Sequence, residues 1–209
     1  MTTKRCVPHS SVNHCCVAAA KIRCDVGRGR RSDMSDGQTA SLDAATSSDA
    51  LLLSNLLELY IHDLSDLFPG IELGADGRFG YPRLPLYGSE RDRRFAFIIR
   101  CGGRVAGFVL ATRGSPAAED PDVLDIAEFF VLRGYRRSGV GRRAAFLLWS
   151  GLPGTWTVRV SEGNRGALAF WSGVIADFTK GAATESTRPG EPNAWRVFSF
   201  ESAPGRANV

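Results

Sequence analysis

The sequence predicts an α/β protein in which a mixed sheet is covered by helices. Beyond residue 93, strand-like runs alternate with helical ones, in the order hairpin, strand, helix, strand, helix, strand. A strand–helix–strand unit implies a right-handed crossover, so at least one pair of strands is parallel. With 209 residues, of which 44% are hydrophobic and 23% charged, the chain has the composition of one soluble globular domain plus a tail.

The first predicted element is an amphipathic helix. Ser47 and Ser48 are good N-cap residues, and Asp49 suits the first turn. Apolar side chains then recur at steps of three and four residues, which places them on one helical face. These side chains are Leu52, Leu53, Leu56, Leu57, Tyr60 and Leu64. Pro69 and Gly70 end the helix.

Residues 71–92 are rich in Gly, Pro and aromatic residues, and we expect a long connection there. A connection of this length inside a compact domain is often functional. Alternatively, its aromatic side chains, Phe79, Tyr81 and Tyr87, only anchor the segment to the core.

The second half of the chain holds the remaining elements. Residues 95–99 and 105–112 read as two strands joined by a tight turn into a hairpin. We then expect a strand at 123–132, a helix at 139–150, a strand at 155–160, a helix at 164–175 and a strand at 194–200.

Charge and cysteine are concentrated at the N-terminus. Residues 1–33 hold seven basic and two acidic side chains, a net charge of +5, which leaves −1 for the rest of the chain. We therefore expect no nucleic-acid or membrane partner for the folded part. Four of the five cysteines also lie there, at spacings that fit neither a disulfide framework nor a zinc site. We expect a cytoplasmic protein without a metal.

These shifts in composition give the predicted boundaries. Residues 1–47 read as a disordered extension and linker, within which Met34 is a candidate start of translation. Residues 48–203 read as the folded domain, and residues 204–209 as a tail.

The segment Arg136–Arg142, R-R-S-G-V-G-R, follows a predicted strand and opens a predicted helix. Glycines at 139 and 141 let the main chain approach a ligand closely. The free N–H groups and the dipole at the start of a helix attract an anion, and arginines nearby can pair with it. The pattern is neither a P-loop nor a dinucleotide fingerprint, because the lysine of the first and the third glycine of the second are missing.

R-x-x-G-x-G after a strand resembles the acetyl-CoA pyrophosphate motif of the GNAT N-acetyltransferases. Residues 164–171, N-R-G-A-L-A-F-W, resemble the N-x-x-A-x-x-F-Y motif that follows it in that family. The resemblance covers about residues 48–200. The chain is also similar to uncharacterised bacterial predicted acetyltransferases, which share the motifs found here at residues 57–65, 78–82 and 127–131.

The resemblance implies a mostly antiparallel sheet with one splayed parallel pair, helices on both faces, and acetyl-CoA as the co-substrate. The pantetheine arm would lie in the splay and the pyrophosphate on the glycine turn. The cofactor-binding residues implied are Phe129, Phe130, Val131, Arg136, Arg137, Ser138, Gly139, Val140, Gly141, Arg142, Asn164, Ala167 and Phe170. Read alone, Asn164 is also a good helix N-cap and Phe170 also fits a core position.

The implied reaction is direct acetyl transfer to the primary amine of a small molecule or peptide. Glu128 is the candidate general base, with a structural ion pair as the alternative role. Trp171 stands where the family usually has the tyrosine that protonates the thiolate, and Tyr81, Tyr87 and His62 are candidate acceptor contacts.

Three functions follow from these observations. The first is an N-acetyltransferase, monomeric or homodimeric. The second is a CoA-binding regulatory module without catalysis, because Trp171 replaces the phenol. The third is a nucleic-acid-associated protein tethered by its basic tail, which the charge of −1 on the domain disfavours.

Overall fold

A computed structural model of the chain describes residues 39–203. Residues 1–38 and 204–209 lie outside the described part, and with them the clustered cysteines, Met34 and the predicted C-terminal tail. The strands are β1 (Ala40–Ala44), β2 (Arg94–Cys101), β3 (Arg104–Arg113), β4 (Leu124–Val131), β5 (Gly154–Ser161), β6 (Thr184–Arg188) and β7 (Trp195–Ser202). The α-helices are α1 (Ala50–Ser65), α2 (Leu86–Ser89), α3 (Val140–Gly151) and α4 (Arg165–Thr179).

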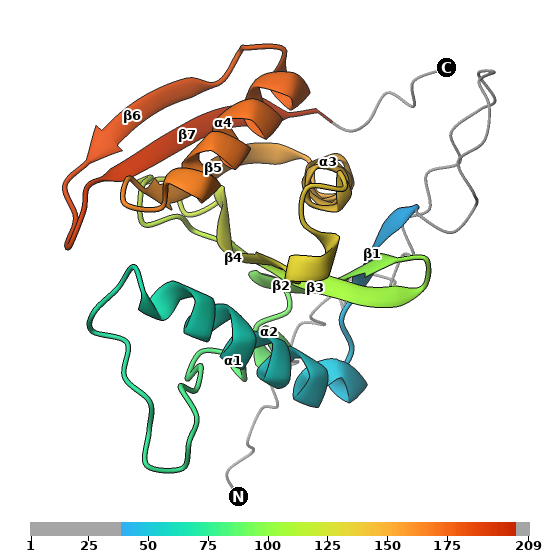
Figure 1. Ribbon diagram of the computed structural model, residues 1–209. Coiled ribbons are helices and arrows are strands. Elements are labelled where there is room, and N and C mark those ends of the chain that lie inside the picture. Colours follow the sequence, from blue (N-terminus) through green and yellow to red (C-terminus); the bar gives the residue numbers. More distant parts are fainter. Residues whose placement is uncertain (1–38, 204–209) are drawn as a thin grey trace, which may run out of the picture.

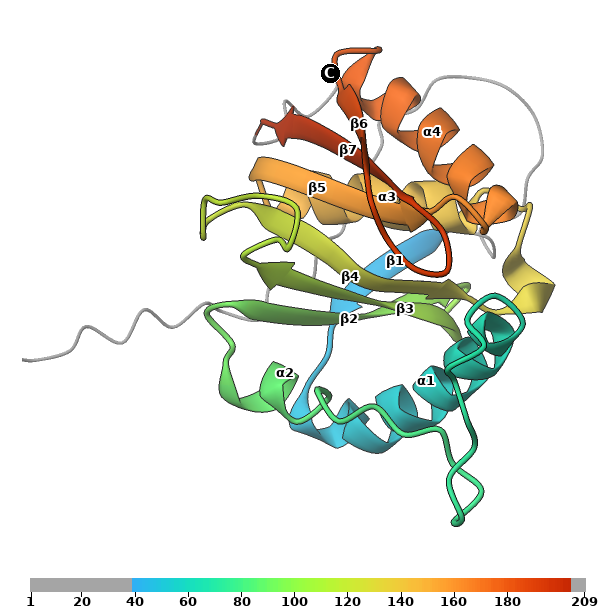
Figure 2. The same cartoon turned by 90° about the vertical axis from the view of Figure 1, so that its left-hand side faces the viewer.

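The seven strands form one sheet in the order β1-β2-β3-β4-β5-β7-β6. Every neighbouring pair is antiparallel except β4 and β5, which are parallel. The helices α1 and α2 lie on one face of the sheet, and α3 and α4 lie on the other (Figures 1 and 2). The predicted mixed sheet with helices on both faces is confirmed. None of the helices within residues 39–203 is long and apolar enough to cross a bilayer.

The two faces of the sheet bury separate apolar clusters. The larger cluster lies under α3 and α4 and includes Trp149, Trp156 and Ile126. The smaller one lies under α1 and includes Leu57, Phe108 and Phe130. Apolar burial of this kind is the main favourable contribution to folding, and here it fixes both helical layers against the sheet.

The parallel strands separate soon after they meet. They pair only at Leu124 with Trp156 and at Asp125 with Thr157. One residue further along β4, a bulge opposite β3 sets Leu110 against Glu128 but Ala111 against Ile126, so Ala127 is the extra residue. A bulge bends its strand and reverses which face the following side chains take. Glu128 therefore points toward α1, although Ile126, two residues earlier, packs under α3 and α4.

A buried polar network holds the two strands together where they begin to separate. The Asp125 side chain is only 1% exposed. It accepts hydrogen bonds from Arg159 Nε at 3.0 Å and Nη2 at 2.8 Å, which is a bidentate ion pair. The hydroxyls of Thr157 and Ser115 donate to the same carboxylate at 2.8 and 3.0 Å. Four donors on one carboxylate compensate for its removal from water.

The prediction that residues 34–47 are a linker is wrong for residues 40–44. These form β1, which pairs with β2 from Ala40 opposite Cys101 to Ala44 opposite Phe97. Leu42 is fully buried, and Asp43 on the other face pairs with Arg100 at 3.0 Å. A strand with one large apolar residue gives too weak an alternation to be separated from a polar linker.

The strand β6, residues 184–188, was not predicted, because no element was expected between the helix at 164–175 and the strand at 194–200. All five of its residues, T-E-S-T-R, are exposed. An edge strand with two solvated faces carries no apolar signal, and its pairing with β7 is a matter of main-chain hydrogen bonds.

The network at Asp125 yields a stability prediction. Replacing Asp125 with alanine leaves the partly buried guanidinium of Arg159 without its partner, and we expect a loss of about 3 kcal/mol in the free energy of unfolding. Urea denaturation measures it. The control Asp177→Ala breaks the exposed pair with Arg142, for which a loss of roughly 0–1 kcal/mol is expected. Equal losses in the two variants would contradict a special role for Asp125.

Candidate functional site

The space between the separating strands is a cleft of about 370 Å³. Its walls come from α1 and the residues after it, from β4, β5 and α4, and from the start of β7. Five of the residues singled out in the sequence line it: Glu128, Phe129, Asn164, Ala167 and Trp171. Segments more than a hundred residues apart in the chain thus meet at one hollow.

Glu128 lies in this cleft with both carboxylate oxygens engaged. Tyr60 of α1 donates its phenol proton to Oε2 at 2.7 Å, and Tyr81 donates to Oε1 at 2.9 Å. Burial raises the pKa of the carboxyl above its usual value, and this effect outweighs the two phenol hydrogen bonds, which lower the pKa. Burial also raises the pKa of both phenols, so they remain donors. The predicted alternative, an ion pair of Glu128 with an arginine, is not what the described contacts show.

Tyr81 reaches Glu128 because the segment 71–92 is attached to α1. Glu58 on α1 accepts the main-chain N–H groups of Phe79 at 2.7 Å and Gly80 at 3.2 Å. Arg78 adds a hydrogen bond to Ser54 at 2.6 Å. These bonds to Glu58 lower the pKa of its carboxyl, so the carboxylate stays ionised and holds the segment at neutral pH. The contacts show the anchoring alternative for this segment, and the same anchoring brings the Tyr81 phenol to Glu128, while a functional role of the segment stays a prediction.

The opposite wall of the cleft is aromatic. Trp171 is only 6% exposed and packs edge-on against Phe129, with ring centroids 4.9 Å apart. Phe170 meets Phe129 at 6.0 Å. Asn164 acts as the N-cap of α4, because its Oδ1 accepts the N–H of Ala167 at 3.0 Å. The interpretation of Asn164 as a helix cap is thus correct, and the residue also faces the cleft.

The glycine turn between β4 and α3 has the backbone geometry of an anion site. Gly139 is the N-cap of α3, adopts a φ of +84°, and has no side-chain cap. A Cβ there would meet nothing within 4 Å, so the turn is open to solvent. Arg137 also has a positive φ, of 62°. Left-handed residues in a turn aim successive N–H groups outward, and the first N–H groups of a helix lack internal partners.

Gly141 is required for a different reason. A Cβ on it would come within 3.2 Å of the Phe170 ring and 3.5 Å of a Val131 methyl group. The absence of a side chain therefore lets the start of α3 pack closely against α4 and the end of β4.

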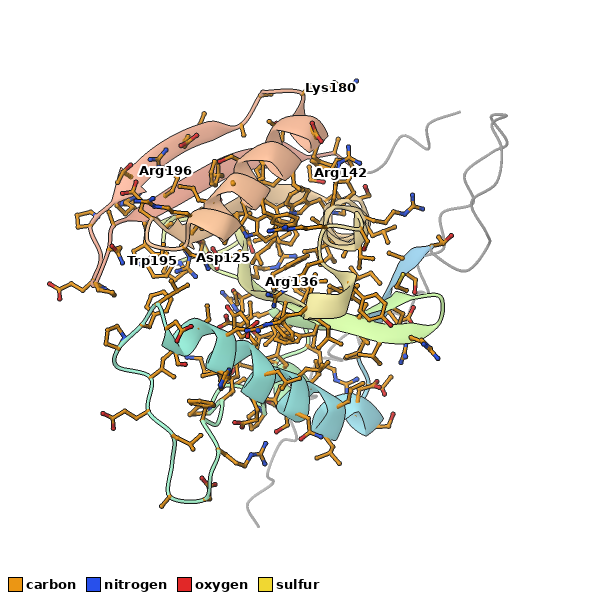
Figure 3. All side chains as sticks on the ribbon, in the orientation of Figure 1. Asp125, Arg136, Arg142, Lys180, Trp195 and Arg196 are labelled. Atoms are coloured by element: carbon orange, nitrogen blue, oxygen red, sulfur yellow. The ribbon has the colours of Figure 1, made fainter. Side chains whose placement is uncertain are left out.

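Two of the three arginines expected to pair with a phosphate are already paired with carboxylates. Arg136 bonds to Asp63 of α1 at 2.6 Å and to the Val131 carbonyl at 2.7 Å, and Figure 3 labels it beside the turn before α3, on the side facing α1. Arg142 bonds to Asp177 of α4 at 3.0 Å. Within residues 39–203, Arg137 alone among the three has no such partner. The partners of these guanidiniums could not be predicted from the motif, because Asp63 and Asp177 lie far from it in the sequence.

Phe130 and Val140 do not line the cleft. The Phe130 side chain is buried against α1, where its ring lies 5.8 Å from that of Tyr60. Val140 is buried on the other side of the sheet, in the cluster under α3. Any contact of these two residues with a ligand in the cleft has to come from their main chain.

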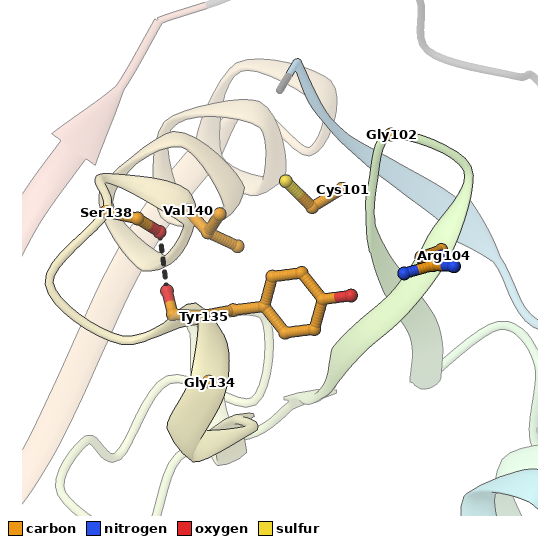
Figure 4. Close-up of a pocket in the computed structure, with 7 residues that line it drawn as sticks. All are labelled: Cys101, Gly102, Arg104, Gly134, Tyr135, Ser138 and Val140. Carbon is orange, nitrogen blue, oxygen red and sulfur yellow. Dashed lines mark hydrogen bonds between the residues drawn. The ribbon is translucent and has the colours of Figure 1, made fainter. Parts of the chain in front are cut away.

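A second hollow, of about 390 Å³, lies beside the glycine turn. It is lined by Cys101, Gly102, Arg104, Gly134, Tyr135, Ser138 and Val140 (Figure 4). The Tyr135 ring points across it toward the turn that joins β2 and β3, and the Ser138 hydroxyl bonds back to the Tyr135 carbonyl at 2.7 Å. None of these lining residues carries a carboxylate, whereas the cleft between the strands holds Glu128.

Several residues of the cleft were missed in the sequence. Arg159 lies in a strand in which Thr155, Thr157 and Arg159 alternate with large apolar residues. This alternation places the three polar side chains on one face, and it was the signal available for Arg159. Tyr60 belongs to the apolar stripe of its helix, so nothing in the spacing separates its hydroxyl from the core. Trp195 and Arg83 reach the cleft from other parts of the chain, and only the tertiary fold brings them there.

Comparison with known proteins identifies the family. The model of the acetyltransferase (GNAT) family matches residues 57–172. No curated protein matches the chain. Among solved structures, an acetyltransferase from Thermus thermophilus is 19% identical with a TM-score of 0.53, over 79% of this chain and 98% of the other.

Two further structures are similar in the same way. A spermidine N-acetyltransferase from Vibrio cholerae, in complex with CoA and spermine, is 11% identical with a TM-score of 0.55, over 78% of this chain and 95% of the other. An aminoglycoside acetyltransferase in complex with coenzyme A is 12% identical with a TM-score of 0.57, over the same shares, 78% and 95%. At these identities the likeness establishes the fold.

The raised pKa of Glu128 predicts how stability depends on pH. The folded protein binds the proton more tightly than the unfolded chain, so this group contributes stability at low pH that is lost as pH rises through the raised pKa. The change begins near the usual value of about 4.5 and ends above it. The variant Glu128→Gln lacks this pH-dependent contribution to stability, because its amide does not titrate. In urea denaturation, wild-type stability relative to Glu128→Gln should fall between acidic and neutral pH, and a constant difference would contradict the prediction.

Proposed function

The chain belongs to the acetyltransferase (GNAT) family, in which acetyl-CoA is the acetyl donor, and we propose that it transfers the acetyl group directly to the primary amine of a small molecule or peptide. Glu128 is the general base in this proposal. The observation that carries it is the position of this carboxyl in the cleft, with a raised pKa and both oxygens held by phenols. We further propose a cytoplasmic enzyme that works as a monomer or homodimer.

The acetyl donor fits the open side of the splay. We propose that the pyrophosphate lies on the N–H groups of residues 137–141, with Arg137 as the cation available to it. The pantetheine arm then runs along the main chain of residues 129–131, past Asn164, Ala167 and Phe170. The aromatic wall formed by Phe129 and Trp171 excludes water from the thioester. The donor supplies a thioester whose thiolate is a fairly good leaving group.

The reaction needs a neutral amine, but an alkylamine is mostly protonated at neutral pH. Glu128 accepts that proton, directly or through water, and a raised pKa makes the carboxylate a stronger base. The amine lone pair attacks the thioester carbonyl, a C–N bond forms and the C–S bond breaks. The developing oxyanion is stabilised by a main-chain N–H of β4 near Val131. As the C–S bond breaks, the nitrogen loses its second proton to water, and water returns a proton to the thiolate.

One observation favours a second candidate, a CoA-binding module without turnover. Trp171 occupies the position of the family's usual tyrosine, is buried among aromatic rings, and its indole N–H is not a useful acid. Among the described residues that line the cleft, no other phenol takes its place on that wall. Release of free thiol from acetyl-CoA separates the two candidates, because the module binds without releasing it.

Replacing the base tests the proposal. Glu128→Gln keeps the shape of the side chain but cannot accept a proton, and kcat should fall about 100- to 10,000-fold. The dissociation constant for acetyl-CoA should stay unchanged in calorimetric titration. Glu119→Gln, which alters an exposed carboxylate outside the cleft, is the matched control. If Glu128→Gln keeps the kcat of the wild-type protein, Glu128 is not the general base.

The glycine turn gives a second test. Asparagine tolerates a positive φ, so Gly139→Asn keeps the turn, whereas Gly139→Asp adds a negative charge where the pyrophosphate is proposed to lie. The aspartate variant should bind acetyl-CoA at least about tenfold more weakly than the asparagine variant, given the usual strength of charge interactions at such sites. Calorimetric titration measures both, and equal affinities would place the phosphates elsewhere.

A further inference from the structure

We infer that the acceptor amine carries an anionic group, a carboxylate or a phosphate, that is bound by Arg83. The inference rests on the proposed function and defines the class of acceptor. It follows from the charges that line the cleft, from which of them are already paired, and from the size of the cleft.

Arg83 lines the same cleft as Glu128 and comes from the segment 71–92. Its side chain is exposed. Among residues 39–203 no carboxylate, carbonyl or hydroxyl accepts a hydrogen bond from its guanidinium, whereas neighbouring Arg78 and Arg94 are both held by glutamates. A guanidinium without a partner among the described residues can bind a carboxylate or phosphate with two parallel hydrogen bonds.

The second cation of the cleft, Arg159, is already engaged. Burial opposes its charge, but the hydrogen bonds with Asp125, together with the negative charges of Asp125 and Glu128, outweigh burial and raise the pKa of the guanidinium, so the pair with Asp125 remains ionised. The charge of Arg159 is therefore compensated inside the protein. Among the lining residues the charged groups without an ion-pair partner are the Glu128 carboxylate, which is held by two neutral phenols, and the Arg83 guanidinium.

One carboxylate and one uncompensated guanidinium match an acceptor that has one amine and one anion. They do not match a polycation, because a polycation needs several carboxylates and would be repelled by Arg83. The spermidine N-acetyltransferase of similar fold was solved with spermine, and the charges of the present cleft argue for a different acceptor.

The end of the cleft limits the size of the acceptor. Phe68, after α1, stacks on Trp195 at the start of β7, with ring centroids 6.2 Å apart and planes 18° apart. The Arg159 guanidinium lies 5.9 Å from the Trp195 ring centroid, and Figure 3 shows Trp195 and Asp125 in the same part of the molecule. These rings join the α1 layer to the far half of the sheet. A cleft of about 370 Å³ that also holds the end of the donor leaves room for a molecule of amino-acid size.

Matched acceptor pairs test the inference with the full chain. Thiol release from acetyl-CoA is measured with the common amino acids and their amides, with phosphoethanolamine and ethanolamine, and with spermidine. We expect kcat/KM to favour an anionic member over its neutral partner by roughly 10- to 100-fold, the usual value of hydrogen bonds to a charged group. A preference within the amino acid and amide pairs indicates a carboxylate as the bound anion, and a preference for phosphoethanolamine over ethanolamine indicates a phosphate.

Variants of the arginine test whether Arg83 causes this preference for anionic acceptors. Arg83→Ala should remove the preference by raising KM for the anionic acceptors while leaving the neutral ones unchanged, and Arg83→Lys should restore part of it. Arg91→Ala, an exposed arginine outside the cleft, should change neither. A preference for amides or spermidine, or an anionic preference that survives in Arg83→Ala, overturns the inference and leaves the proposed function intact.

The two proposals fail separately. If no acceptor releases thiol, the proposed function fails, and calorimetric titration of the same amino acids and of phosphoethanolamine into the CoA-saturated protein decides the inference. Binding that disappears in Arg83→Ala supports an anion subsite. Absence of such binding overturns it.

Discussion

The ion pair between Asp125 and Arg159 is the constraint on which the cleft depends. β4 and β5 share only two paired positions, and the second of them includes Asp125. Beyond it the strands diverge, and no ladder holds them at a fixed angle. The bidentate pair, with Thr157 and Ser115, closes this point of the sheet in the interior, where a charge pair is stable only with good geometry and further hydrogen bonds. The pair thereby joins the two strands at the point from which they diverge.

The bulge at Ala127 adds the second constraint, which decides the face on which the Glu128 carboxyl lies. Without it, Glu128 and Ile126 would face the same way, and the carboxyl would lie under α3 and α4. With it, Glu128 meets the phenols of Tyr60 and Tyr81, which come from the opposite layer. In the proposed function the donor then enters past the glycine turn and the acceptor past α1 and the segment 71–92.

Much of the fold could be predicted, because long periodic segments and glycine turns are local signals. The helix at 139–150 and the turn before it follow from R-S-G-V-G and the apolar positions after it. The strands β1 and β6 could not be predicted in this way. Leu42 is the only large apolar residue of β1 and β6 has none, so their pairing depends on strands far away in the sequence.

The candidate site was predictable to the same extent. Glu128 and Phe130 were both singled out in the sequence, and they lie on one face of β4, where both contact Tyr60. The partners of that carboxyl were not predictable, since Tyr60 sits in an apolar stripe and Tyr81 in a loop. Nor was the pairing of Arg136 and Arg142 with Asp63 and Asp177, because such contacts join different elements and no spacing within one motif encodes them.

The most direct test of the proposed donor site is the amide spectrum of the ¹⁵N-labelled chain during titration with CoA. We expect the largest shifts at Phe129, Val131, Gly139 and Gly141, which follow the splay and the glycine turn. Shifts confined to Cys101, Gly102 and Arg104, with β4 unperturbed, would place CoA in the neighbouring hollow and contradict the proposed site.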